Sequence, residues 1–317
     1  MADLLLFYQM VDQFICLYRD GAYQKALDLL DREAPQYPVG EAMTLAWQSA
    51  MLARLGRVDE AIQRLRLAYE RGYWYHESAL VQDPDFQLLQ GNLQFEQVVG
   101  LFSMRRMVAA AQTRPALETI VPGGSGLYPL FLALHGNQSS VALSTDFWRS
   151  AADRGWLLAL PQSSQPTWVS GFAVWNDMAM ALTEMHAHLA QLTASYPVDP
   201  QRVVAAGFSM GAQVALRMAL SPQFHLRGVV VVEAWLPEES MAELAQVVKR
   251  APRPAPRIYL IAGKENSEYY HMAEEVYSLL QAHDIPCALE GSSNPHHNFP
   301  ADFDQVLQRA LTFICQE

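Results

Sequence analysis

The sequence has little cysteine, relatively few cations and no long apolar run. Cys16, Cys287 and Cys315 are too few and too widely spaced for a disulfide framework or a cysteine metal site. Lys and Arg number 22 against 33 Asp and Glu, and the net charge of −11 argues against nucleic acid or an anionic membrane as the main partner. No stretch approaches the roughly 20 apolar residues of a membrane span. We therefore expect a soluble protein in a reducing compartment.

The N-terminus is apolar but lacks the features of an export signal. Asp3 and Asp12 interrupt its apolar residues, and neither a basic n-region nor a small-residue cleavage site is present. We expect a buried helix here and a cytoplasmic location. With 317 residues, 51% of them apolar and 17% charged, the chain has room for a large core and more than one domain.

Residues 1–112 are predicted to be helical and contain a repeat. GAYQKAL, which begins at Gly21, recurs as GRVDEAI, which begins at Gly56, and this spacing is close to the 34-residue tetratricopeptide period. In each copy a small residue, Ala26 or Ala61, allows the preceding helix to approach closely. The segment resembles the tetratricopeptide family over two repeats at most, and an unrelated array of helical hairpins is the alternative.

Two such repeats bury too little apolar surface to stand alone. We therefore expect this helical domain to pack on the rest of the chain or to continue into another helix pair through residues 92–112. Repeats of this kind usually bind peptides or other proteins, so a protein or peptide partner is predicted here. Capping an active site or holding a dimer together are equally simple roles.

The helical pattern ends at Thr113-Arg114-Pro115, and Pro122–Gly126 then forms a turn between two early strands. Further on, strands and helices alternate, which predicts a mostly parallel sheet covered by helices on both faces. The predicted strands are 128–134, 156–160, 203–206, 228–232, 257–262 and 286–290. The predicted helices are 144–154, 176–195, 211–220, 238–250, 268–283 and 301–315. The domains are thus 1–112 and 115–317.

The best candidate for chemistry is Ser209, in the run Gly207-Phe208-Ser209-Met210-Gly211 between an apolar strand and a helix. Two glycines permit a tight turn, which predicts a nucleophile elbow with an exposed hydroxyl. The backbone N–H of Met210 then supplies half of an oxyanion site. Because ligands of parallel sheets bind at the carboxyl ends of strands, Ser209 lies where an active site is expected.

Two further stretches also follow strands. His135-Gly136-Asn137-Gln138 is predicted to present the N–H of Asn137 as the second oxyanion donor, with His135 more typical of a packing residue. Near the end of the chain, His296 and His297 lie on a loop before the last helix, where a general base is expected.

These stretches together resemble the α/β-hydrolase family, specifically its esterase, phospholipase/carboxylesterase and dienelactone-hydrolase-like members. The matching motifs are Leu134–Asn137, Gly207–Gly211 and His297–Pro300, and they cover about residues 115–315. The resemblance implies an α/β-hydrolase domain and selects His297 over His296 through the Phe-Pro pair. His296 stands where the family usually has glycine.

Enzymes of this family use a catalytic triad of serine, histidine and an acidic residue, and the position of the acidic residue departs here from the family pattern. The family places aspartate in a G-x-x-D motif, and here Gly263-Lys264-Glu265-Asn266 carries asparagine at that position. We rank Glu265 first as the carboxylate, then Glu233 after the VVVV strand, then Glu268. Asn266 itself, with a slow enzyme, remains an alternative.

Trp168, Trp175 and Trp235 follow strand ends and are predicted to line an apolar substrate pocket, although contacts to the helical domain would equally explain them. Nothing predicts a cofactor or a metal: His186 and His188 lie two apart on a helix and so point to different faces.

The sequence therefore predicts a serine hydrolase that cleaves carboxylic ester or thioester bonds of a small-molecule or acyl substrate through Ser209, His297 and Glu265. One alternative is a hydrolase scaffold with weak or lost catalysis that acts as a protein-interaction module, which Asn266 favours. The other is a serine peptidase, whose extra domain is usually a propeller and not helical.

Overall fold

A computed structural model describes residues 2–112, 114–124, 126–294 and 296–316. Thr113, Ser125 and Pro295, which belong to the predicted boundary, turn and loop, lie outside the described residues. The chain divides into a first unit, Met1–Arg114 with Pro166–Phe172, and a second unit, Pro115–Gln165 with Ala173–Glu317.

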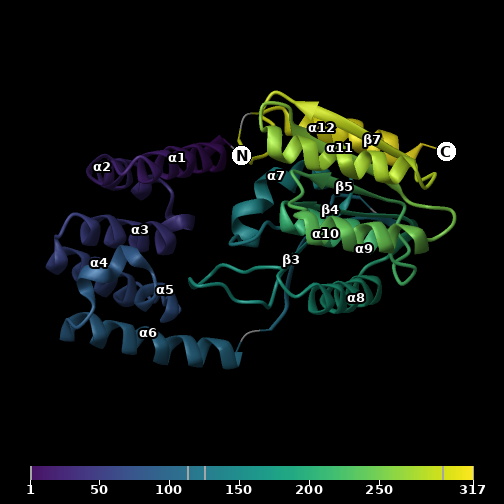
Figure 1. The fold of residues 1–317 in the computed structure, drawn as a ribbon. Helices are drawn as coiled ribbons and strands as arrows, with labels where there is room; N and C mark the ends of the chain where they lie inside the picture. Colours follow the sequence, from purple (N-terminus) through teal and green to yellow (C-terminus); the bar gives the residue numbers. More distant parts are fainter. Residues whose placement is uncertain (1, 113, 125, 295, 317) are drawn as a thin grey trace. The chain divides into compact units, whose positions relative to one another are not determined.

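Helices make up the regular structure of the first unit (Figure 1). α1 packs on α2, α2 on α3, α3 on α4, and α4 on α6. Gly21 and Gly56, the repeat glycines, both have positive φ, 70° and 75°, which suits a turn that a side chain would strain. Ala26 and Ala61 are fully buried, as the close approach of neighbouring helices requires. The helices are α1 (Ala2–Arg19), α2 (Tyr23–Glu33), α3 (Glu41–Arg54), α4 (Val58–Glu70), α5 (Ser78–Val81) and α6 (Leu93–Gln112), with short 3-10 helices at Ala34–Gln36, Pro38–Gly40 and Pro84–Leu89.

The short segment Pro166–Phe172 belongs to the first unit although the sequence predicted it within the second domain. Val169 forms a β-bridge with Tyr75, and the ring of Trp168 stacks on that of Tyr75 with centroids 6.0 Å apart. The carbonyl of Trp168 accepts the N–H of His76 at 2.7 Å. This pairing is an isolated β-bridge, too short to produce an alternating apolar pattern, and the sequence therefore did not predict it.

The second unit is built on a seven-stranded sheet in the order β1-β3-β2-β4-β5-β6-β7. β1 pairs antiparallel with β3, and all other neighbours are parallel. The predicted strand 203–206 is only the inner part of β4, because the first five residues of β4 are not buried and show no apolar pattern. The strands are β1 (Ala116–Ile120), β2 (Tyr128–Leu134), β3 (Leu157–Gln162), β4 (Val198–Phe208), β5 (Gly228–Val232), β6 (Arg257–Gly263) and β7 (Cys287–Ser292).

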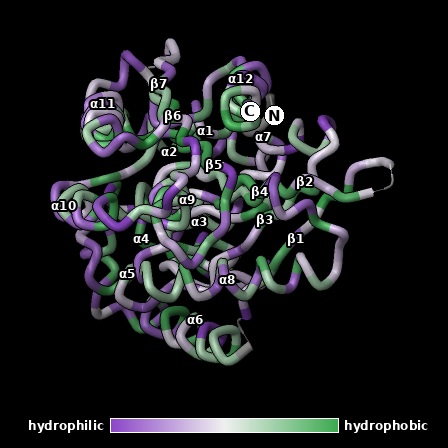
Figure 2. Tube along the Cα trace, turned by 90° about the vertical axis from the view of Figure 1, so that its right-hand side faces the viewer, coloured by the Kyte–Doolittle hydropathy of each residue, from purple (hydrophilic) through white to green (hydrophobic). Residues whose placement is uncertain are grey.

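Helices cover both faces of this sheet (Figure 1). One set buries residues such as Met185, Val214 and Leu280 against it. In the other set, Trp148 packs on Phe131 of β2, and Phe303 packs on Trp148. Figure 2 shows α11 and α12 with both hydrophobic and hydrophilic residues around their turns, as expected of helices on a sheet. The first set is α8 (Met178–Ser195), α9 (Met210–Ala219), α10 (Glu238–Val247) and α11 (Ser267–Gln281), and the second is α7 (Val141–Asp153) and α12 (Phe303–Cys315). The predicted fold class is confirmed.

Within the described ranges, no helix is long and apolar enough to cross a bilayer.

Candidate active site

Ser209 occupies a strained turn between β4 and α9. Its backbone has φ 55° and ψ −121°, a conformation that side-chain-bearing residues rarely adopt. The turn is held by hydrogen bonds from the N–H of Ser209 to Val232 O at 3.0 Å and from Gln213 N–H to Ser209 O at 3.2 Å. The strain therefore coincides with the residue that the sequence predicts as nucleophile.

Gly207 and Gly211 make this turn possible. A Cβ atom on Gly207 would lie 2.3 Å from the backbone of Gly211, and one on Gly211 would lie 2.3 Å from the carbonyl oxygen of His135. Such distances are far below any normal contact, so strand and helix approach this closely only with glycine at both positions.

The turn after β2 lies directly beside the elbow. A Cβ atom built on Gly136 would be 3.5 Å from Ser209 Cβ. The Asn137 side chain fastens this turn, because its Oδ1 accepts the N–H of Trp175 at 2.7 Å and its Nδ2 donates to Asn176 Oδ1 at 2.9 Å. Among the described residues, the backbone N–H groups of Asn137 and Met210 have no hydrogen-bond partner. Both are therefore available to a bound oxygen atom.

His135 is a buried structural residue, as expected. Its Nε2 accepts the N–H of Ser163 at 3.3 Å, so Nδ1 carries the proton and donates to Gly136 O at 2.7 Å. Burial lowers the pKa of His135 to about 4, and the hydrogen bond to Gly136 opposes this only in part. The ring is therefore neutral at pH 7.

His297 lies half-buried between aromatic neighbours, whereas His296 is exposed. The imidazole of His297 has the Tyr269 ring 3.9 Å and the Phe208 ring 4.7 Å from its centroid. Phe208 directly precedes Ser209, so the ring of His297 lies next to the elbow.

Glu233 is the carboxylate that lies beside His297. It follows β5, is fully buried, and has a positive φ of 47°. Its Oε1 accepts the N–H of Gly263 at 2.6 Å, and its Oε2 lies 3.7 Å from Nδ1 of His297. Among the described residues, Oε2 and Nδ1 are both buried atoms without a hydrogen-bond partner. Each is therefore the natural partner of the other, since buried polar atoms are rarely left unsatisfied.

The ranking of Glu265 ahead of Glu233 needs correction. Glu265 and Glu268 are both exposed, and Asn266 is the N-cap residue of α11. The ion pair that the structure gives to His297 is with Glu233. Glu233 follows β5 and His297 follows β7, and both strands are parallel neighbours of β6, so the two residues lie at the same edge of the sheet.

The three predicted pocket tryptophans have three different environments. Trp235 is half-buried, and its ring centroid lies 5.7 Å from that of Tyr269. The backbone N–H of Trp235 donates to Ser209 O at 3.4 Å. Trp175 is fully buried, and its indole N–H donates to His135 O at 2.8 Å, so its side chain supports the turn after β2. Trp168 belongs to the first unit. The assignment of Trp175 to the pocket wall is therefore corrected, because its fully buried ring holds the turn after β2, while the assignment of Trp168 stays a prediction.

Sequence reasoning missed Tyr269 and Phe208 as neighbours of the histidine. Phe208 is the variable residue inside the five-residue elbow motif, and Tyr269 follows Asn266 by three positions at the start of α11. The available signal was the position of Phe208 at the end of β4 and of Tyr269 in the first turn of the helix that follows β6.

Two family models match the chain. The model described as A/B hydrolase-like, N-terminal domain, matches residues 6–110, and the model described as Phospholipase/Carboxylesterase matches residues 172–313. Together they take up more than half of the 317 residues. With this sheet and elbow, the chain belongs to the α/β-hydrolase family, with a helical N-terminal domain.

Among curated proteins, the chain is similar to Esterase FrsA of Salmonella paratyphi B and of Salmonella newport. Each is 30% identical to it over 178 residues, which is 50% of this chain and 41% of the relative. The chain thus matches less than half the length of these relatives.

Among solved structures, an uncharacterized protein from Bacillus cereus is 26% identical, with a TM-score of 0.56 over 98% of this chain and 99% of that one. Esterase PE8 is 21% identical, with a TM-score of 0.51 over 63% of this chain and 99% of its own, which is evidence for the fold alone.

Proposed function

We propose that this protein is a serine hydrolase that cleaves carboxylic ester or thioester bonds of a small-molecule or acyl substrate. In this proposal Ser209 is the nucleophile, His297 the general base and Glu233 the acid. The main support is a pair of buried atoms, Glu233 Oε2 and His297 Nδ1, which lie 3.7 Å apart. Neither atom has a hydrogen-bond partner among the described residues, and the His297 ring lies next to the elbow.

The proposed chemistry follows from these roles. Glu233 holds the proton of His297 on Nδ1, which leaves Nε2 to accept the proton of the Ser209 hydroxyl as its oxygen attacks the carbonyl carbon. The negative oxygen of the tetrahedral intermediate accepts hydrogen bonds from the N–H groups of Met210 and Asn137. The bond to the alcohol or thiol then breaks, and that group leaves with the proton from His297. Water releases the acyl group from Ser209 by the same steps.

The main argument for an inactive scaffold was asparagine at position 266. A carboxylate from the neighbouring strand, Glu233, removes the need for an acid there.

The exposed part of Trp235, near Tyr269, is the proposed apolar wall of the substrate site. The Esterase FrsA relatives are named as esterases, which supports the same reaction class.

Covalent labelling with a fluorophosphonate tests the proposal. The wild-type protein is expected to be labelled at Ser209 and to hydrolyse p-nitrophenyl acetate, and Ser209→Ala to do neither while its thermal midpoint stays nearly unchanged. Ser221→Ala, which alters a half-buried serine after α9, is the matched control. Labelling or full activity in Ser209→Ala would remove the nucleophile from the proposal.

A further inference from the structure

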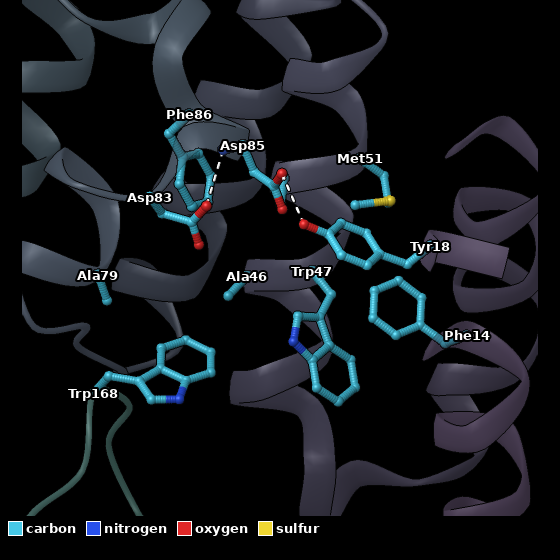
Figure 3. A pocket seen from close by; sticks show the side chains of 11 residues that line it. Phe14, Tyr18, Ala46, Trp47, Met51, Ala79, Asp83, Asp85, Phe86 and Trp168 are labelled. Atoms are coloured by element: carbon cyan, nitrogen blue, oxygen red, sulfur yellow. Dashed lines mark hydrogen bonds between the residues drawn. The ribbon is translucent and has the colours of Figure 1, made fainter. Parts of the chain in front are cut away.

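The first unit contains a cavity of about 390 Å³ that the proposed hydrolase chemistry does not use (Figure 3). It is lined by residues of α1, α3, α5 and the 3-10 helix Pro84–Leu89, together with Asp83 and Trp168. All of these belong to the first unit. The walls carry five aromatic side chains, Phe14, Tyr18, Trp47, Phe86 and Trp168. We call this space the aromatic cavity.

Several of these rings are fixed by packing against neighbours. Phe14 stacks on Trp47 with centroids 4.8 Å apart and 19° between the planes, and Trp168 is held against Tyr75. Trp47, Tyr18 and Trp168 are only half-buried, so part of each remains open to a ligand. An aromatic face carries partial negative charge and attracts a cation that comes within about 6 Å of its centroid.

Two carboxylates add negative charge, and they differ in how far it is compensated. Asp85 is buried, and its Oδ1 is paired with Arg54 Nε at 2.5 Å and accepts the hydroxyl of Tyr18 at 3.1 Å. Asp83 is exposed and accepts the N–H of Asp85 at 2.9 Å (Figure 3). Within the described part of the chain, Asp83 has no cationic partner. The uncompensated charge at the cavity is therefore that of Asp83.

We propose that the aromatic cavity binds a small organic cation, an ammonium group that carries apolar substituents. The rings and Asp83 would attract its charge, and Ala46, Ala50 and Met51 would contact its apolar part. An anion is disfavoured by the uncompensated charge of Asp83. A bare metal ion is disfavoured because most of the lining is apolar and offers few oxygen ligands.

Binding to the full-length protein, measured by isothermal titration calorimetry, tests this inference with benzyltrimethylammonium as the probe. Trp47→Leu keeps an apolar side chain but removes the aromatic face, and is expected to weaken binding by roughly threefold to thirtyfold, the range of a cation–π contact. Asp83→Asn keeps an oxygen that can accept the N–H of Asp85, and is expected to weaken binding as well. Asp28→Asn, the same change at an exposed position of α2, is the control and is expected to bind like the wild type.

A second comparison separates charge from shape. Choline and its neutral counterpart 3,3-dimethyl-1-butanol have nearly the same shape, so saturation-transfer NMR at millimolar concentration should detect choline much more strongly. Equal binding of the neutral alcohol, unchanged affinity in Asp83→Asn, or no binding of benzyltrimethylammonium would overturn the inference. If Trp47→Leu fails to fold, Asp83→Asn still provides the test, since it alters an exposed side chain.

Discussion

The imidazole of His297 lies almost parallel to the ring of Tyr269, with centroids 3.9 Å apart and 21° between the planes. The Phe208 ring is also close and inclined by only 31°. Burial, with a contribution from the Glu268 and Glu233 carboxylates, raises the pKa of Tyr269 to about 12, so its hydroxyl is neutral at pH 7. Aromatic packing therefore holds the plane of the histidine while Nδ1 faces Glu233.

The first prediction concerns this stacking. Tyr269→Ala is expected to lower kcat for p-nitrophenyl acetate by up to about 100-fold, because a general base displaced by an ångström loses its alignment. Tyr269→Phe keeps the ring and is expected to remain near wild-type activity. Steady-state kinetics of the two variants check this. Equal losses in both would mean that the hydroxyl, and not the ring, is what matters.

The second prediction concerns the acid. Glu233→Gln is expected to reduce kcat by about 10⁴, or some 5 kcal/mol, because the amide cannot stabilise the imidazolium or fix the same tautomer. Glu265→Gln, in the exposed loop after β6, is the matched control and should change kcat little. A large loss in Glu265→Gln with an active Glu233→Gln would reverse the assignment.

The third prediction separates the two adjacent histidines. His297→Ala should lose activity by several orders of magnitude, whereas His296→Ala should lose much less, because His297 is the one beside Glu233 and Phe208. Rates of ester hydrolysis by the two purified variants provide the measurement. Comparable losses would show that the ion pair seen here does not identify the base.

The fourth prediction concerns pH and His135. Its pKa is about 4 in the folded protein and near 6.5 in an unfolded chain, so between these values only the unfolded chain binds this proton. Folding stability should therefore fall as the pH drops from about 6.5 to 4, by about 3 kcal/mol for this group.

His135→Asn removes this titration and can keep a donor toward Gly136 O. Urea unfolding at a series of pH values should show a shallower loss of stability in His135→Asn than in the wild type, whatever the absolute difference between them. Parallel pH profiles would contradict the prediction.

Much of the fold and part of the candidate site could be predicted from the sequence, because those features depend on near neighbours in the chain. Gly207 and Gly211 flank Ser209 within five residues, and their lack of a side chain dictates the tight turn. The continuous apolar runs of the inner strands likewise identify a sheet buried on both faces. The resemblance to the family selected His297 over His296 through the register of Phe299-Pro300, which begins two positions after His297.

Only the tertiary structure decided which side chains meet across the sheet. Glu233 and His297 are 64 positions apart, and they meet because β5 and β7 flank β6 in parallel, so that the segments after both strands begin at the same edge of the sheet. Trp168 follows the same strand as Trp175, yet it pairs with the helical unit while Trp175 is buried under the His135 turn. The sequence determines local geometry through short-range sterics and apolar pattern, whereas these contacts depend on strand order and loop paths, which leave no local pattern in the chain.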